Sequence, residues 1–146
     1  MVLWTLEHNY GGLENMSLIP GNTGTAPIQN IGAYGVELKD VCEYVDVLDI
    51  ETLQVKRYLA EHCEFGYRDS IFKQALHGKV VIVNVGLKLA RQWQAKTNYG
   101  PLAELGNDVN AMRIFDQVCS TRASKLPDPR QLGNAGSFFK NPVLTD

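Results

Sequence analysis

Apolar positions at the start of the chain follow a helical repeat. Leu3, Leu6 and Tyr10 recur at helical spacing, and Gly11-Gly12 follows as a stop signal. A helix over residues 2–10 is therefore predicted. Because no capping residue precedes this helix, we interpret the chain as an internal piece of a longer protein.

Three later stretches have the pattern of strands. Residues 41–50 are rich in β-branched side chains, and residues 53–58 alternate in polarity and are predicted to return antiparallel to them. The clearest strand covers residues 80–89. Its alternation predicts one apolar face, which consists of Val81, Val83, Val85, Leu87 and Leu89. Short helices are predicted at residues 59–63 and 70–76.

A second amphipathic helix is predicted after an irregular stretch. Residues 90–106 follow no regular pattern, and a run of that length without its own structure is more often functional than idle. Asn107-Asp108 is predicted to cap the helix, and the prolines after Lys125 end it. The predicted apolar face consists of Ala111, Ile114, Phe115 and Val118.

Composition narrows the class of protein. A chain of 146 residues with 45% hydrophobic and 21% charged residues fits one globular domain. The net charge of −2, without a cluster of lysines and arginines, argues against a nucleic-acid partner. No apolar run is long enough to span a bilayer, and the N-terminus lacks the features of a secretion signal, so we expect a cytoplasmic protein.

The cysteines and histidines do not form a recognisable metal or disulfide pattern. Cys42, Cys63 and Cys119 are odd in number and widely spaced, so we interpret them as reduced, mostly packed thiols. The three histidines lack metal-ligand spacing and have no acidic or cysteine neighbours that would complete a site. No metal is therefore predicted.

The stretch from residue 18 to residue 35 organises the rest of the chain. It holds four glycines and two prolines, yet apolar residues are interleaved throughout, which is atypical of a linker. Pro20-Gly21 suits a type II turn, and Gly24, Gly32 and Gly35 let a ligand approach the backbone closely. Such turns can bind phosphate. The alternative is an ordered loop between core elements, which spacing alone favours.

Two side chains are candidates for catalysis. Arg68 lies in a loop, where a guanidinium can hold a carboxylate by two parallel hydrogen bonds; the alternative is a structural pair with Asp69 or another acid. Ser137 follows Gly136, but Phe139 replaces the second glycine of a nucleophile elbow. A nucleophilic serine is therefore not predicted, and the alternative is an ordinary turn residue.

Two further side chains are candidates for ligand binding. Lys125 could present an ammonium group to an anionic substrate, although a solvated lysine at a helix end is the commoner arrangement. Tyr99 could hydrogen-bond a ligand or anchor its loop by packing.

Several motifs taken together are more specific than any one of them. In chain order they are Gly12-Leu13-Glu14-Asn15 through Gly35-Val36-Glu37, Phe65-Gly66-Tyr67-Arg68-Asp69-Ser70, Lys125-Leu126-Pro127-Asp128-Pro129, and Gly133-Asn134-Ala135-Gly136-Ser137-Phe138-Phe139-Lys140-Asn141-Pro142. They resemble the family of UDP-N-acetylenolpyruvoylglucosamine reductases over essentially the whole chain. The insertion from Trp93 to Leu102, with Tyr99-Gly100, resembles the subclass that closes a tyrosine-bearing loop over its substrate.

The resemblance implies a fold and a reaction. The fold would be α+β, the second subdomain of an FAD-binding domain of the vanillyl-alcohol-oxidase (PCMH) type, with a mixed or antiparallel sheet. It implies FAD as cofactor, NADPH as hydride donor, and UDP-N-acetylenolpyruvoylglucosamine as substrate, reduced to UDP-N-acetylmuramate for peptidoglycan. Residues 1–124 would form the FAD-binding part, with a substrate loop at 90–106, and residues 125–146 would begin the substrate-binding domain. We expect a monomer.

The resemblance also implies roles for individual residues. Arg68 would meet the charge that develops on the substrate carboxylate, and Ser137 would be the proton donor. Tyr99, Lys125 and Asn141 would contact the nucleotide sugar. The flavin would lie along the glycine-rich stretch, near Pro20, Gly21, Gly24, Gln29, Asn30, Ile31, Gly32 and Tyr34.

The family also has parts that this sequence does not match. It has a glycine-rich first domain that holds part of the FAD and a catalytic glutamate near its C-terminus. We therefore expect an internal fragment that binds FAD weakly and turns over little by itself. The alternatives are a folded but non-catalytic fragment, or another FAD oxidoreductase of the same fold, such as an oxidase of small alcohols.

Overall fold

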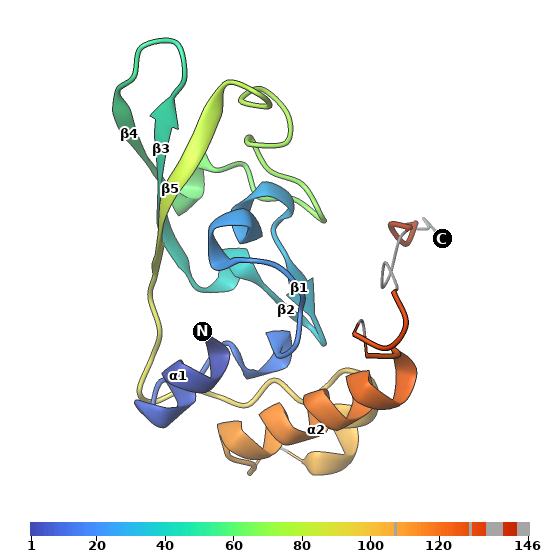
Figure 1. Ribbon diagram of the computed structural model, residues 1–146. Coiled ribbons are helices and arrows are strands. Elements are labelled where there is room, and N and C mark those ends of the chain that lie inside the picture. Colours follow the sequence, from blue (N-terminus) through green and yellow to red (C-terminus); the bar gives the residue numbers. More distant parts are fainter. Residues whose placement is uncertain (107, 129, 134–138, 143–146) are drawn as a thin grey trace.

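A three-stranded antiparallel sheet forms one end of the molecule (Figure 1). In the computed structural model, β3 (Cys42–Asp49) lies between β4 (Val55–Leu59) and β5 (Val80–Leu87). The structure describes residues 1–106, 108–128, 130–133 and 139–142. The three predicted strands and the antiparallel return of the second are confirmed.

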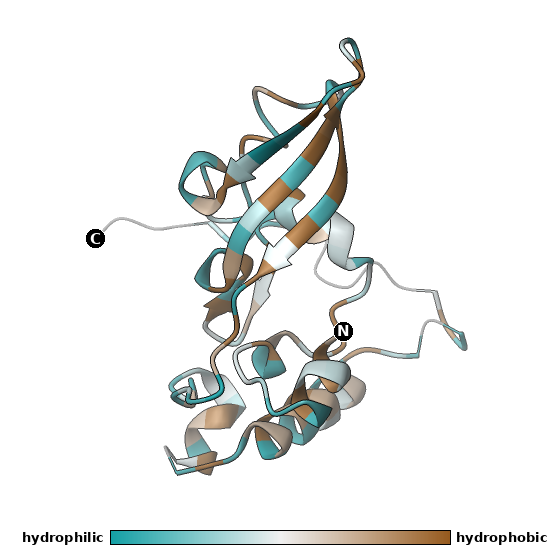
Figure 2. Cartoon of the chain, turned by 90° about the vertical axis from the view of Figure 1, so that its left-hand side faces the viewer, coloured by the Kyte–Doolittle hydropathy of each residue, from teal (hydrophilic) through white to brown (hydrophobic). Residues whose placement is uncertain are grey.

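Strand β3 is the centre of the sheet and the core. Val45 and Val47 point to one face of β3 and are fully buried, together with Cys63, and Phe72 is buried in the same cluster. On the other face, the Asp46 carboxylate accepts hydrogen bonds of 2.7 and 2.9 Å from Arg57 on β4. Apolar and polar residues are mixed along β3, whereas the first half of β5 is apolar throughout (Figure 2).

The face predicted for the third strand is wrong in its first half. Val81 and Val83 are 50% and 45% exposed, whereas Val80 and Ile82 pack against the core. Asp46 pairs with Asn84 but Val47 pairs with Ile82, so Val83 is an extra residue in a β-bulge. Side chains along a strand alternate with a period of two. The extra residue therefore reverses which side chains face the core in the first half of β5.

Two α-helices lie at the opposite end of the molecule from the sheet (Figure 1). The predicted first helix is confirmed as α1 (Val2–Glu7) and the second as α2 (Ala111–Lys125). The cap of α2 was predicted too early: the side chain of Asn110 accepts from the backbone N–H of Arg113 at 2.8 Å. Of the predicted cap, Asn107 lies outside the described residues. On the apolar face of α2, Ile114 and Val118 are fully buried against Leu102.

Short elements connect the two ends. They are the 3₁₀-helices η1 (Glu14–Met16), η2 (Thr23–Gln29), η3 (Leu38–Asp40), η4 (Ala60–His62) and η5 (Gly100–Leu105), and the two-residue strands β1 (Gly32–Ala33) and β2 (Val36–Glu37). Element η4 confirms the short helix predicted at 59–63. The helix predicted at 70–76 is wrong, because this segment forms hydrogen-bonded turns. There the Ser70 hydroxyl accepts from the N–H of Phe72, a local bond that competes with a helix.

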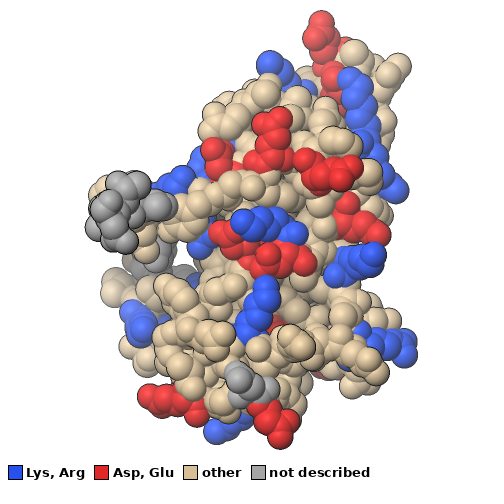
Figure 3. Space-filling view, turned by 180° about the vertical axis from the view of Figure 1, so that it is seen from behind, with Lys and Arg blue, Asp and Glu red and all other residues tan. Residues whose placement is uncertain are grey.

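The cysteines are mostly packed, as the sequence predicts, and charges of both signs lie on the surface (Figure 3). Cys42, Cys63 and Cys119 are free thiols, and burial raises the pKa of Cys63 to about 12. On the face shown in Figure 3, acidic and basic side chains are interspersed. In the part of the chain that the structure describes, no helix is long and apolar enough to cross a membrane.

Candidate functional site

The glycine-rich stretch is folded, and its glycines have different roles. Residues 23–29 form η2, and residues 32–37 form the β1–β2 hairpin. A Cβ on Gly32 would lie 2.5 Å from the carbonyl oxygen of Val36, so only glycine fits there. Gly21 has φ +114° and Gly35 has φ +80°, in the left-handed region that favours glycine. The stretch is therefore an ordered element, as expected.

The first part of this stretch leaves room for an anionic ligand. Gly21 and Gly24 are exposed, and no heavy atom lies within 4 Å of a Cβ placed on Gly24. Pro20 and Gln29, which flank them, are also exposed. The backbone of this segment is therefore open to the surface, and its contact with the pyrophosphate of FAD stays a prediction.

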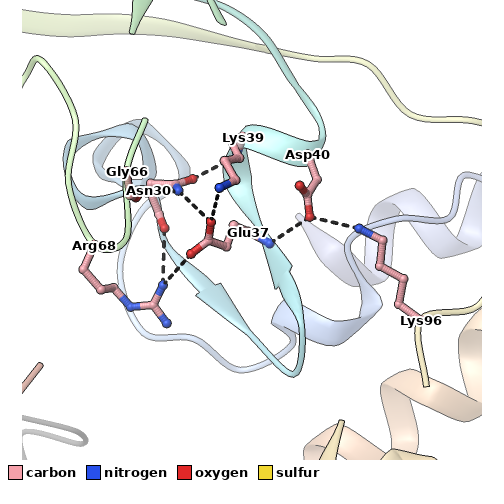
Figure 4. Close-up of polar contacts among 7 residues, drawn as sticks. All are labelled: Asn30, Glu37, Lys39, Asp40, Gly66, Arg68 and Lys96. Atoms are coloured by element: carbon pink, nitrogen blue, oxygen red, sulfur yellow. Dashed lines mark hydrogen bonds and ion pairs between the residues drawn. The ribbon is translucent and has the colours of Figure 1, made fainter. Parts of the chain in front are cut away.

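Buried Asn30 joins this stretch to the loop that carries Arg68 (Figure 4). Its side-chain amide is fully buried and donates to the carbonyl of Gly66 at 2.9 Å and to Glu37 Oε2 at 3.1 Å. Its side-chain oxygen accepts from the N–H of Lys39 at 2.9 Å. Asn30 is also predicted to bind the cofactor, and that role stays a prediction beside these contacts within the protein. Its role in the fold is therefore to hold three segments together.

Arg68 lies against the glycine-rich backbone. Its Nη2 donates to the carbonyl of Gly32 at 2.6 Å, and its Nη1 donates to the carbonyl of Asn30 at 3.5 Å and lies 3.6 Å from Glu37 Oε1. These three contacts do not use all five N–H donors of a guanidinium. The side chain is 30% exposed. Arg68 is therefore structurally paired with an acid, which is Glu37 instead of neighbouring Asp69, and it keeps N–H donors beyond these three contacts.

The charged residues around Glu37 connect the hairpin to residues 90–106. Lys39 Nζ lies 2.9 Å from Glu37, and this hydrogen bond raises the pKa of Lys39 above its ordinary value. Lys96 Nζ lies 3.0 Å from the carboxylate of Asp40. Burial raises the pKa of Asp40, but the hydrogen bond from Lys96 and further contacts outweigh it, so the pKa lies below its ordinary value.

A second connection joins Tyr34 to Tyr99. The two rings meet edge to face with centroids 6.3 Å apart. Fully buried Asn15 donates 2.8 Å hydrogen bonds to the carbonyls of both Tyr34 and Lys96. The structure therefore brings the predicted cofactor residue Tyr34 next to the predicted substrate residue Tyr99. Tyr99 is 59% exposed, so more than half of its surface stays accessible.

Glu14, beside Asn15, is a buried carboxyl group whose ionisation opposes folding. It is 2% exposed, and its Oε2 accepts from the N–H of Gly12 at 2.7 Å. Burial raises the pKa of Glu14 above the ordinary value of 4.5. The stability from this site is fully present below pH 4.5 and is lost as the pH rises through the raised pKa of the folded state.

We therefore expect Glu14→Gln to gain stability relative to the wild type as the pH rises from 4.5 to 7.5. Glutamine keeps an oxygen that can accept from Gly12 but cannot ionise. Thermal unfolding of both proteins across this pH range measures the effect, with exposed Glu51→Gln as control. A stability difference that does not change with pH would contradict it.

Of the other four predicted site residues, three lie within the described part of the chain, each in a different place. Asn141 lines a cavity of about 410 Å³ together with Gly66, Tyr67, Asp69, Lys140 and Pro142, beside the turn that carries Arg68. Lys125 is the exposed last residue of α2 and does not line this cavity. Ser137 lies outside the described residues. Ile31 is partly buried, and its carbonyl accepts from the N–H of Leu38 at 2.8 Å.

Sequence reasoning missed two residues that organise the site. Glu37 and Asn15 both lie within the quoted motifs, but neither was assigned a role. An acidic residue next to the glycine-rich stretch was a usable signal for Glu37, because Arg68 needs a counter-charge. Among the described residues, no cluster of His, Cys, Asp or Glu side chains could hold a metal ion.

Known proteins are similar to this chain over nearly its whole length, although no protein-family model matches it. Three curated proteins named UDP-N-acetylenolpyruvoylglucosamine reductase cover 99% of it. They come from Vibrio vulnificus (57% identical), Photobacterium profundum (59%) and Pasteurella multocida (58%). The chain spans 42–43% of their length.

A solved structure shares the fold. It is the UDP-N-acetylenolpyruvylglucosamine reductase from Thermus caldophilus, with a TM-score of 0.69 and 27% identity, over 97% of this chain and 44% of that one. The resemblance and the α+β fold predicted from the sequence are therefore confirmed, and the chain is homologous to part of these reductases. The domain boundary at residues 124–125 and the roles of the site residues stay predictions.

Proposed function

We propose that this chain is the part of a UDP-N-acetylenolpyruvoylglucosamine reductase that holds the flavin and the reacting carboxylate of the substrate. The observation that carries the proposal is the placement of Arg68 against the backbone of Asn30 and Gly32, within a sequence 57–59% identical to such reductases. We place the protein in the cytoplasm, acting on UDP-N-acetylenolpyruvoylglucosamine in the synthesis of peptidoglycan precursors.

The reaction saturates a carbon–carbon double bond. FAD, when bound, would supply a hydride that it receives from NADPH. The hydride would add to the terminal methylene carbon of the enolpyruvyl group, which would become a methyl group. The electron pair of the double bond would move to the neighbouring carbon, and that carbon would then take a proton to give the lactyl ether. The protein must therefore stabilise negative charge and deliver one proton.

Two side chains of this chain would meet these two requirements. Arg68 would bind the carboxylate and stabilise the charge that develops beside it, using N–H donors that its contacts with Gly32 and Asn30 leave over. Ser137 would donate its hydroxyl proton to the charged carbon, which is basic enough to take it. Tyr99, Lys125 and Asn141 would contact the nucleotide sugar.

The cofactor would lie along the glycine-rich stretch. Pro20, Gly21, Gly24 and Gln29 would border its pyrophosphate, with Asn30, Ile31, Gly32 and Tyr34 toward the ring. The exposure of Gly21 and Gly24, and the open space beside Gly24, support this placement, because no side chain blocks this part of the backbone.

The first test of this placement is Gly24→Asp. A carboxylate beside a bound phosphate repels it by roughly 1 kcal/mol, so we expect the affinity for FAD to fall about fivefold. Riboflavin lacks phosphate, and its affinity should not change. Titration of flavin fluorescence against the purified protein measures both.

The matched control is Gly133→Asp, because Gly133 is likewise an exposed glycine with open space around it. This variant should bind FAD like the wild type. A purified protein with no flavin in its visible absorption spectrum and no affinity for added FAD would contradict the proposed function. Equal loss of FAD and riboflavin in Gly24→Asp would contradict only the phosphate site.

A further inference from the structure

Glu37 lies between the buried amide of Asn30 and the guanidinium of Arg68 (Figure 4). One carboxylate oxygen, Oε2, accepts from Asn30 at 3.1 Å, and the other, Oε1, lies 3.6 Å from Arg68 Nη1. Only 22% of the Glu37 side chain is exposed. Both oxygens therefore have partners, and one of these partners is the residue proposed to meet the substrate carboxylate.

The position of Glu37 is fixed by local structure. Glu37 ends the β1–β2 hairpin and caps η3, where its backbone N–H donates to Asp40 Oδ2 at 3.1 Å in a capping box. Asn30, which holds the Glu37 carboxylate, also holds the carbonyl of Gly66, two residues before Arg68. The carboxylate and the turn that carries Arg68 are therefore attached to the same buried amide.

Arg68 needs such support because its side chain is long. A free arginine side chain loses up to about 2 kcal/mol of conformational entropy when it becomes ordered. Here the carbonyl of Gly32 holds Nη2 at 2.6 Å from one side, and Glu37 faces Nη1 from another. These contacts orient the plane of the guanidinium before any ligand arrives.

We propose that Glu37 is a positioning residue for Arg68: together with Asn30, it orients the guanidinium toward the substrate carboxylate. This inference rests on the proposed function, since it takes Arg68 as the group that meets that carboxylate. A misplacement of about 1 Å can cost about 100-fold in rate, so the orientation matters for turnover. The effect on substrate affinity is smaller, because two effects oppose each other. Removal of the Glu37 charge makes Arg68 more available to an anion, but it also makes the orientation of the guanidinium less fixed.

The test uses two substitutions of Glu37 in the full-length protein. Glu37→Gln keeps the length of the side chain but removes the charge. Glu37→Asp keeps the charge and can still cap η3, but its carboxylate is one methylene too short to reach Arg68. We expect both variants to lower kcat per folded molecule about tenfold, while KM for the enolpyruvyl nucleotide sugar changes by less than about threefold.

The matched control is Lys39→Met, which removes the other ion-pair partner of Glu37 and leaves its contact with Arg68. Because exposed ion pairs contribute little, kcat should stay within about twofold of the wild type. A second readout is the nuclear magnetic resonance signal of the Arg68 Nε–H group, identified by its loss in Arg68→Lys. We expect this signal to shift or broaden in both Glu37 variants and to stay unchanged in Lys39→Met.

The outcomes separate the two proposals. Normal kcat in either Glu37→Gln or Glu37→Asp would overturn the positioning role. The proposed function would still stand if Arg68→Lys turns over slowly. A decrease only in the folded fraction, with an unchanged Arg68 signal, would also overturn it and show that Glu37 is purely structural. Normal turnover in Arg68→Lys would overturn both proposals.

Discussion

Arg68→Lys is expected to lower turnover by about 100-fold or more. Lysine keeps the positive charge but presents a point charge, which cannot reproduce the planar pair of hydrogen bonds that a guanidinium makes to a carboxylate. It also cannot contact Gly32, Asn30 and Glu37 at once, as Arg68 does. Steady-state kinetics of the full-length enzyme with NADPH and the enolpyruvyl nucleotide sugar measures the loss.

Arg68→Lys also avoids a complication from the backbone. Residue 68 has φ +54°, a left-handed conformation that costs arginine and lysine about the same energy. The comparison therefore isolates the effect of the side-chain head group. The matched control is Arg57→Lys. Arg57, on β4, makes a bidentate ion pair with Asp46, and its guanidinium carbon lies 3.6 Å from the centroid of the Tyr44 ring. This control should lower the unfolding temperature but leave kcat unchanged, and normal turnover in Arg68→Lys would contradict the role of Arg68.

Ser137→Ala is expected to slow product formation by about 10²- to 10⁴-fold, the contribution usual for a positioned proton donor. Reduction of bound flavin by NADPH should proceed at the wild-type rate, because this half-reaction needs no proton from Ser137. Rapid-mixing absorption measurements follow the two half-reactions separately. The prediction rests on the sequence motif, since Ser137 lies outside the described residues.

The control for this experiment is Ser124→Ala on α2. The Ser124 hydroxyl donates to the backbone carbonyl of Thr121 at 2.9 Å and is not part of the proposed site. Both half-reactions should be normal in this variant. If Ser137→Ala slowed both half-reactions equally, its role as proton donor would be wrong and a structural role would replace it.

The cofactor and substrate assignments have unequal structural support. Tyr34 and Tyr99 come together, and Asn141 lies beside the turn that carries Arg68, although these residues are far apart in the sequence. Lys125 and the exposed Gly24 are not brought to the same place by any of these contacts. The FAD and substrate roles of all of them stay predictions that the variants above test.

The sequence by itself determined the elements whose cause is local. The β-branched run at 41–50, its antiparallel return, and the amphipathic helix after residue 110 follow from patterns within ten to twenty residues, and the structure confirms them. The ordered motifs also determined the relationship to the reductases, since motif order needs no knowledge of spatial contacts.

Only the tertiary structure decided which face of β5 is buried and which acid pairs with Arg68. The bulge at Val83 arises from pairing with β3, more than thirty residues away, and no pattern inside residues 80–89 contains it. Glu37 reaches Arg68, instead of neighbouring Asp69, because Asn30 holds the hairpin and the turn at Gly66 together. Periodicity in the sequence reflects the local secondary structure of a segment. Strand register and long-range pairing depend instead on residues that only folding brings close.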